Sequence, residues 1–325
     1  MNTATKKSKV VVVGAGKVGA SVAYTIMMNN LTSEIVLVDV DRNRARGEAL
    51  DISHGIAYFK QVLIRDGDFD DCADADVVVI AAGLGRQPGQ TRLDLARTNV
   101  TVTRDIVGRI MKYASNPLIL VISNPVDVLT YLVQKESGLR PCRVIGSGTA
   151  LDTGRFRYLL SDHCKVDVRN VHAYIIGEHG DSEVPVWSRA SIASKPFDEY
   201  CEDCPRRCQK INRQKIFEQT RDAGAEIILT NTFGGIIRMK GSTFYGVALA
   251  ATRIVGAVMG DENSVLTVSS VLTGQYGITD VALSLPSIVN HNGIDRYLDI
   301  RISEDEAKLL EQSAEKLKAV IKEVC

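Results

Sequence analysis

The sequence has no long hydrophobic run, no excess of one charge and few cysteines. A bilayer-spanning helix needs about 20 mainly apolar residues, and the richest segment, from Thr243 to Gly260, is interrupted by Arg253. The 39 basic residues balance 39 acidic ones, so charge gives no reason to expect nucleic acid or a membrane as partner. Seven cysteines in 325 residues exclude a disulfide scaffold. With no signal peptide expected before Val10, we predict reduced thiols and a cytoplasmic location.

The first half of the chain alternates short β-branched runs with helical patterns. The runs cover residues 9–13, 34–39, 62–65, 76–81, 118–123 and 144–145, and the helical patterns cover 18–29, 43–58, 91–114 and 127–136. Most of the runs are almost wholly apolar, which is typical of parallel strands buried on both faces. The alternation therefore indicates βαβ units and a parallel sheet.

The pattern changes after about residue 148. We expect helices over 151–163, 211–238 (with a break near Gly234 and Gly235), 243–258 and 304–324, and strands over 170–176, 186–192, 265–272 and 281–288. At about 100–200 residues per domain, the chain divides into a nucleotide-binding domain, residues 1–148, and an α+β substrate-binding and catalytic domain, residues 149–325.

A glycine-rich turn follows the first strand. Gly14, Gly16 and Gly19 form a Gly-x-Gly-x-x-Gly motif that opens a helix, and Asp39 ends the next strand, 20 residues after Gly19. This context matches the dinucleotide fingerprint of a doubly wound Rossmann sheet. The helix N-terminus favours the pyrophosphate, and a carboxylate at the ribose 2′-hydroxyl favours NAD over NADP. The alternative is a strand–helix turn that binds no ligand.

Two further segments carry polar side chains suited to catalysis. His179 lies between glycines just after an expected strand, where it is able to exchange a proton. Asp152 and Arg155 share a helix face, so one carboxylate could orient the histidine while the guanidinium holds a carboxylate substrate. A plain loop histidine and a surface ion pair are the alternatives. The glycine-rich stretch 83–92 follows an apolar strand and suggests a lid that carries arginines, or otherwise a solvated loop.

Together these motifs resemble the NAD-dependent 2-hydroxy-acid dehydrogenases of the lactate/malate type, and the L-lactate branch most closely. The matching segments run in family order along nearly the whole chain: residues 14–19, 88–95, 123–127, 146–155, 177–181 and 240–246. The resemblance implies reduction of a 2-keto acid such as pyruvate to lactate. It implies that His179 donates the proton, that Asp152 orients it, and that Arg92 on the lid stabilises the developing alkoxide.

The resemblance also implies two sets of binding residues. The substrate contacts would be Arg86, Arg92, Asn124, Arg155 and Thr243. The NAD contacts would be Gly14, Gly16, Val18, Gly19, Asp39, Arg44, Gly83, Leu84, Asn124 and Ser147.

Arg86 departs from the lactate pattern. Lactate relatives usually carry a glutamine at this lid position, whereas malate relatives carry an arginine that pairs with a second substrate carboxylate. Gln87 is adjacent and could take this place if the loop shifts by one residue. The neighbouring motifs favour lactate, and a malate dehydrogenase or a mixed 2-keto-acid reductase is the alternative.

Arg157 lies about 200° around the expected helix from Arg155, so both cannot face one pocket. With His172 it matches the positions that bind fructose 1,6-bisphosphate between subunits in allosteric bacterial lactate dehydrogenases. The resemblance thus implies this effector and a homotetramer. A strand histidine satisfied by a neighbour is the alternative.

Three cysteines, Cys201, Cys204 and Cys208, lie within eight residues and match no motif of the resemblance. A zinc or iron–sulfur site needs a fourth ligand, and none is near in sequence, so we predict no metal. A surface loop is the simplest interpretation. The remote alternative is a non-catalytic NAD or redox sensor that uses this loop.

Overall fold

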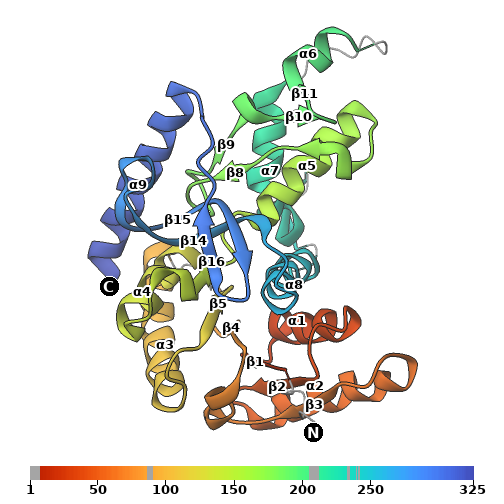
Figure 1. The fold of residues 1–325 in the computed structure, drawn as a ribbon, viewed down its shortest axis with the longest axis vertical. Coiled ribbons are helices and arrows are strands. Elements are labelled where there is room, and N and C mark those ends of the chain that lie inside the picture. Colours follow the sequence, from red (N-terminus) through yellow and green to blue (C-terminus); the bar gives the residue numbers. More distant parts are fainter. Residues whose placement is uncertain (1–7, 86–90, 205–211, 233–234, 239, 241) are drawn as a thin grey trace, which may run out of the picture.

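In the computed structural model (Figure 1), residues 8–85, 91–204, 212–232, 235–238, 240 and 242–325 are described. A nine-stranded sheet forms the centre of the molecule, in the order β16-β15-β14-β6-β5-β4-β1-β2-β3. Its parallel strands are β1 (Lys9–Val13), β2 (Glu34–Val38), β3 (Leu63–Asp66), β4 (Val77–Ile80), β5 (Leu118–Val121) and β6 (Val144–Gly146). The order 3-2-1-4-5-6 confirms the predicted Rossmann sheet.

Three antiparallel strands extend this sheet beyond β6. They are β14 (Ser264–Thr273), β15 (Thr279–Asn290) and β16 (Gly293–Tyr297), and β14 joins β6 through the pair Ser269 and Gly146. Strands from the second half of the chain therefore continue the sheet of the first half. Gly148, the last residue of the predicted first domain, has a left-handed φ of +49°. A Cβ there would lie 2.2 Å from Ser284 Oγ.

Helices cover both faces of the sheet (Figure 1). One face carries α3 (Arg92–Tyr113), α4 (Val126–Ser137) and α9 (Glu304–Val324), and the other carries α1 (Lys17–Met28), α2 (Arg42–His54) and α8 (Tyr245–Met259). A hydrophobic core lies on each face of the sheet. Alternate residues of β1 belong to different cores, because successive side chains of a strand point to opposite faces. Val11 and Val13 belong to the core under α3 and α4, whereas Val10 and Val12 belong to the core under α1 and α8.

A third, smaller core lies under α5 (Ala150–Cys164), at the end of the molecule away from β3 (Figure 1). The remaining elements include α6 (Phe197–Glu202), α7 (Arg213–Ile228), β7 (Val171–His172), β8 (Ile175–Ile176), β9 (Val184–Pro185), β10 (Ser191–Ile192), β11 (Lys195–Pro196), β12 (Leu229–Thr232) and β13 (Gly235–Arg238). Short 3₁₀ turns cover Gly55–Tyr58, Phe69–Asp74, Pro141–Arg143, Val168–Asn170, Trp187–Arg189 and Gln275–Gly277.

Three expected elements are wrong. The strand expected over 170–176 is divided into β7 and β8, which belong to different sheets. The helix expected to reach residue 238 ends at Ile228, and β12 and β13 form a hairpin there. The β-branched residues of this segment favour a strand, and in sequence they resembled the end of a helix. The strand expected over 186–192 is reduced to β10, because a 3₁₀ turn covers Trp187–Arg189.

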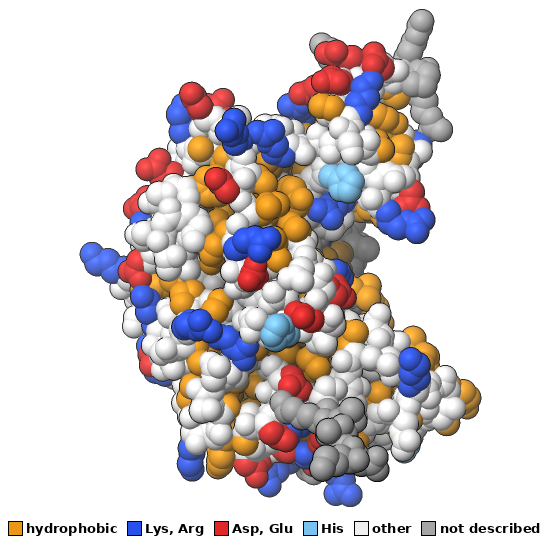
Figure 2. Space-filling view, viewed as in Figure 1, with side chains coloured by type: hydrophobic (Ala, Val, Ile, Leu, Met, Phe, Trp, Pro, Cys, Tyr) orange, Lys and Arg blue, Asp and Glu red, His pale blue; other side chains and the backbone are white. Residues whose placement is uncertain are grey.

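The face shown in Figure 2 mixes basic and acidic side chains without a large area of one sign. This distribution agrees with the net charge of zero. Among the described residues, no helix is long and apolar enough to cross a membrane.

Candidate active site

The glycine turn between β1 and α1 is built for a ligand that approaches the backbone closely. Gly14 has a φ of +104°, and a Cβ there would lie 2.5 Å from the backbone nitrogen of Ala82. A Cβ on Gly19 would lie 1.8 Å from the Gly14 carbonyl oxygen, so α1 can pack against the turn only with glycine at this position. Nothing lies within 4 Å of a Cβ on Gly16. The turn therefore leaves open space next to the first N–H groups of α1, where a pyrophosphate would bind.

The Asp39 carboxylate is held beside this turn. Its Oδ2 accepts a hydrogen bond from the Ala15 N–H at 2.7 Å, and its Oδ1 accepts one from the Asp41 N–H at 2.9 Å. Because a carboxylate has about four lone-pair positions, Asp39 can still accept from ribose hydroxyls. Val18 lies in the first turn of α1, and Arg44 lies in the first turn of α2 with its guanidinium 3.8 Å from Asp41.

The loops after β4 and β5 are joined by a residue that sequence reasoning missed. Asn99 of α3 is only 1% exposed. Its Oδ1 accepts from the Leu84 N–H at 2.8 Å, and its Nδ2 donates to the carbonyls of Leu84, at 3.2 Å, and Asn124, at 2.7 Å. Asn99 thus fixes the two loops that contain Gly83, Leu84 and Asn124. A buried asparagine in an amphipathic helix is a weak signal, because its partners are 15 and 25 residues away.

Two of the remaining predicted residues, Asn124 and Ser147, follow β5 and β6 at the carboxyl edge of the parallel strands. The Asn124 side chain accepts from the Val126 N–H at 3.3 Å, and the bond between Asn124 and Pro125 is cis. Ser147 follows β6 and donates its N–H to the Val121 carbonyl at 2.8 Å. Thr243 lies just before α8 and is half-buried. Arg92 is the first residue of α3, whereas Arg86 lies outside the described residues.

His179 and Asp152 form a close pair. His179 lies on the turn after β8, which begins at Gly177 with a φ of +87°, and Asp152 lies in the first turn of α5. The His179 Nδ1 and Asp152 Oδ2 atoms are 2.6 Å apart. The Asp152 side chain is 2% exposed, whereas that of His179 is 27% exposed. The carboxylate is therefore buried behind an imidazole that reaches solvent.

The charges around this pair favour a protonated imidazole. Burial alone lowers the pKa of His179, but the Asp152 charge and hydrogen bond outweigh burial and raise that pKa to about 9. Burial likewise raises the pKa of Asp152, and the opposing effects of His179 and Arg155 bring it below its usual value. The pair therefore holds an imidazolium and a carboxylate at neutral pH, and a proton is present for donation.

A second buried carboxylate holds the histidine turn in place. The Oδ2 of Asp127, on α4, accepts from the His179 N–H at 2.7 Å. Burial raises the pKa of Asp127 to about 6, and the hydrogen bond from the His179 N–H opposes this rise. Asp127 ends the 123–127 motif, but the sequence predicts no role for it, because its contact joins residues 52 positions apart.

Arg155 also contacts Asp152. Its Nη1 donates to Asp152 Oδ1 at 2.8 Å, and its side chain is 16% exposed. Helix α7 packs beside the guanidinium, since a Cβ on Gly224 would lie 3.8 Å from Nη2. One carboxylate thus positions both an imidazolium and a guanidinium. Two cations at one site can bind the carboxylate of a substrate and protonate its carbonyl oxygen.

Arg157 and His172 lie on a different part of the surface from Arg155. Arg157 Nε donates to the Ala173 carbonyl at 2.9 Å, and its guanidinium carbon lies 5.3 Å from the centre of the Tyr174 ring. His172 is exposed on β7, directly before Ala173. The guanidinium is therefore held next to the strand that carries this histidine.

The cysteine segment lies at the end of α6. Cys201 is in α6, Cys204 follows it, and Cys208 lies outside the described residues. Within the described part of the chain, no group of three or more His, Cys, Asp or Glu side chains is arranged to hold a metal ion.

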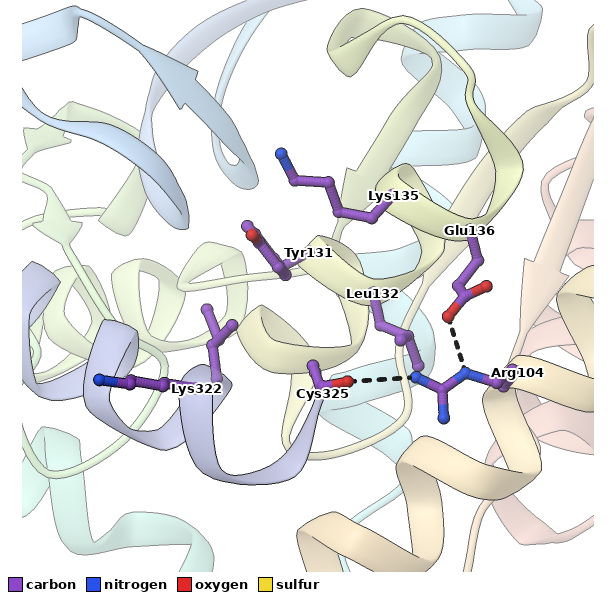
Figure 3. A pocket seen from close by; sticks show the side chains of 8 residues that line it. Arg104, Tyr131, Leu132, Lys135, Glu136, Lys322 and Cys325 are labelled. Carbon is purple, nitrogen blue, oxygen red and sulfur yellow. Dashed lines mark hydrogen bonds and ion pairs between the residues drawn. The ribbon is translucent and has the colours of Figure 1, made fainter.

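A pocket of about 300 Å³ lies between α3, α4 and α9 (Figure 3). Arg104 crosses it, donating to Glu136 Oε1 at 2.7 Å and to the Cys325 backbone carbonyl at 3.5 Å. Its other lining residues are Tyr131, Leu132, Lys135, Ile321 and Lys322. It contains neither the glycine turn nor His179, so the chemistry lies elsewhere.

The sheet order, the glycine turn with Asp39, and the His179–Asp152 pair define an NAD-dependent dehydrogenase. The family model "lactate/malate dehydrogenase, NAD binding domain" matches residues 8–146, and "lactate/malate dehydrogenase, alpha/beta C-terminal domain" matches residues 149–325. The chain belongs to the lactate/malate dehydrogenase family, and its cofactor is NAD.

Similar proteins cover nearly the whole chain. It is 50% identical over 322 residues to the L-lactate dehydrogenase of Acetivibrio thermocellus, covering 99% of each chain. It is 47% identical to L-lactate dehydrogenase 1 of Clostridium acetobutylicum, covering 96% of this chain and 97% of the relative. The ligand-bound crystal structure of minor L-lactate dehydrogenase from Enterococcus mundtii has a TM-score of 0.92 at 42% identity, and covers 98% of this chain and 99% of that one.

Proposed function

We propose that this protein is an L-lactate dehydrogenase that interconverts pyruvate and lactate. The observation that carries the proposal is that Asp152 holds both His179, at 2.6 Å, and Arg155, at 2.8 Å. The similarity to curated L-lactate dehydrogenases supports the choice of substrate. Residues 1–148 would form the NAD-binding domain and residues 149–325 the substrate-binding domain, in a cytoplasmic enzyme.

Each side chain of the site has a separate role in the reduction of the substrate. NAD in its reduced form supplies the hydride when bound. Arg155 binds the substrate carboxylate through two parallel hydrogen bonds. His179 donates its proton to the carbonyl oxygen, and Asp152 stabilises the imidazolium before that transfer. Arg92 from the lid and Asn124 bind the carbonyl oxygen, and Thr243 lines the pocket.

The cofactor would bind along the carboxyl edge of the parallel strands. The glycine turn holds the pyrophosphate, and Asp39 accepts hydrogen bonds from the ribose. The further contacts are the ones that the family resemblance implies: Val18, Arg44, Gly83, Leu84, Asn124 and Ser147.

Substrate choice is tested by measuring NADH oxidation with pyruvate and with oxaloacetate side by side. We expect kcat/KM for pyruvate to be higher by about tenfold or more. Arg86→Gln is the matched variant, because it removes the guanidinium that could pair with a second carboxylate. If oxaloacetate is preferred by orders of magnitude and Arg86→Gln abolishes that preference, the protein is a malate dehydrogenase.

We further propose that fructose 1,6-bisphosphate binds at Arg157 and His172 in a homotetramer. The anchored Arg157 guanidinium and the exposed His172 support this site, because both can donate charge-assisted hydrogen bonds to a phosphate. Addition of the bisphosphate should raise the rate with pyruvate, and Arg157→Gln should abolish this increase. Gel filtration should give a tetramer. A monomer with and without the bisphosphate would contradict the proposed shared site.

A further inference from the structure

Glu183 is a buried acid next to the catalytic pair that has no role in the proposed mechanism. It lies in the turn between His179 and β9 and is only 5% exposed. Its Oε1 has no hydrogen-bond partner among the described residues. A buried carboxylate oxygen that accepts no hydrogen bond makes the charged form costly, because the charge loses its contact with water.

The charged groups that act electrostatically on Glu183 come from three elements. Asp152 and Arg155 are on α5, His179 is on the turn after β8, and Arg221 is on α7. Burial raises the pKa of Glu183 most, and the negative charge of Asp152 raises it further. The three cationic groups lower it. The pKa is raised from its usual 4.5 to about 9. The burial of the side chain and the unpartnered Oε1 likewise favour the protonated form at neutral pH.

We propose that Glu183 is a positioning residue that stays protonated in the resting enzyme, so that the site accepts a substrate carboxylate. As a neutral acid, Glu183 leaves Asp152 as the anion that holds Arg155. When Glu183 ionises, a second negative charge acts on Arg155 and repels an incoming carboxylate through a medium of low dielectric constant. Alkaline conditions should therefore weaken substrate binding through Glu183, in addition to the effect of deprotonating His179.

The first test compares KM for pyruvate in the native protein and Glu183→Gln from pH 7 to pH 10. This test rests on the proposed function for its substrate. Glutamine is a neutral amide of the same length, so its charge does not change with pH. We divide the KM of the native protein by the KM of the variant at each pH. This ratio should be higher above about pH 9 than at pH 7. The loss of one proton gives an increase of up to about tenfold per pH unit. Glu183→Asp, which can still ionise, should keep a pH-dependent ratio.

The second test measures stability and needs no substrate. Because the folded protein binds the Glu183 proton more tightly than the unfolded chain, this group stabilises the fold most below pH 4.5, and that contribution is lost as pH rises towards 9. The equilibrium constant for unfolding of the native protein, divided by that of Glu183→Gln, should increase by up to about tenfold per pH unit between pH 6 and pH 9. The matched control is Glu218→Gln, an exposed carboxylate on α7, for which we expect no such trend.

The outcomes separate this inference from the proposed function. If the stability difference depends on pH but the protein has no activity on pyruvate, the protonated state of Glu183 is supported and the proposed substrate is contradicted. A stability difference that is constant from pH 6 to pH 9, or a Glu183→Gln protein that does not fold at pH 7, would overturn the inference. A KM ratio that is independent of pH would overturn the role of Glu183 in substrate binding.

Discussion

Asp152→Asn should lower kcat/KM for pyruvate by about 10²- to 10⁴-fold at pH 7. The change keeps the size of the side chain and an oxygen that can accept from Arg155, but it removes the negative charge beside His179. That charge raises the pKa of His179 to about 9, whereas burial lowers it. In the variant the pKa should fall to the usual 6.5 or below, and the imidazole would be neutral at pH 7 with no proton to donate.

The pH profile makes this prediction specific. Reduction by the native enzyme should be lost as pH rises through about 9, and in Asp152→Asn the same loss should occur near or below neutral pH. The control is Asp162→Asn, an exposed carboxylate on the same helix that pairs with Lys165. Steady-state kinetics from pH 5 to pH 10 measures both variants. An unchanged alkaline limb in Asp152→Asn would mean that Asp152 does not control the protonation of His179.

Arg155→Lys should raise KM for pyruvate by on the order of 10²- to 10³-fold. The planar guanidinium can donate two parallel hydrogen bonds to a carboxylate, whereas the ammonium of lysine is a point charge that cannot reproduce this fork. Arg155 is largely buried between Asp152 and α7, so bulk water does not replace the lost contact. The measurement is the dependence of the rate on pyruvate concentration at saturating NADH.

The matched control is Arg169→Lys, because Arg169 is exposed and pairs only with the neighbouring Asp167 among the described ion pairs. We expect its KM to equal that of the native enzyme. If Arg155→Lys also keeps the native KM, Arg155 does not bind the substrate carboxylate, and the cation that binds it must be sought elsewhere in the site.

Several parts of the site follow from local sequence. The glycine turn and Asp39 were predicted because the motif requires a strand before it, a helix after it and a fixed spacing to the acid. Asp152 and Arg155 were placed on one helix face by their spacing of three residues. The central sheet was predicted because its buried strands are almost continuously apolar. Each of these signals lies within one strand, turn or helix, so it can be recognised in a short segment of the sequence.

Other contacts arise only where distant segments cross. Asn99 joins two loops, Asp127 holds the His179 turn from 52 residues away, and Glu183 is buried in the turn that follows His179. The hairpin of β12 and β13 was mistaken for a helix because short apolar segments fit either period. The sequence by itself determined the Rossmann half and the cofactor turn, and its family resemblance predicted the catalytic side chains. Only the tertiary structure decided which carboxylate meets which cation and how deeply each is buried, because burial and distance between remote residues set their charges.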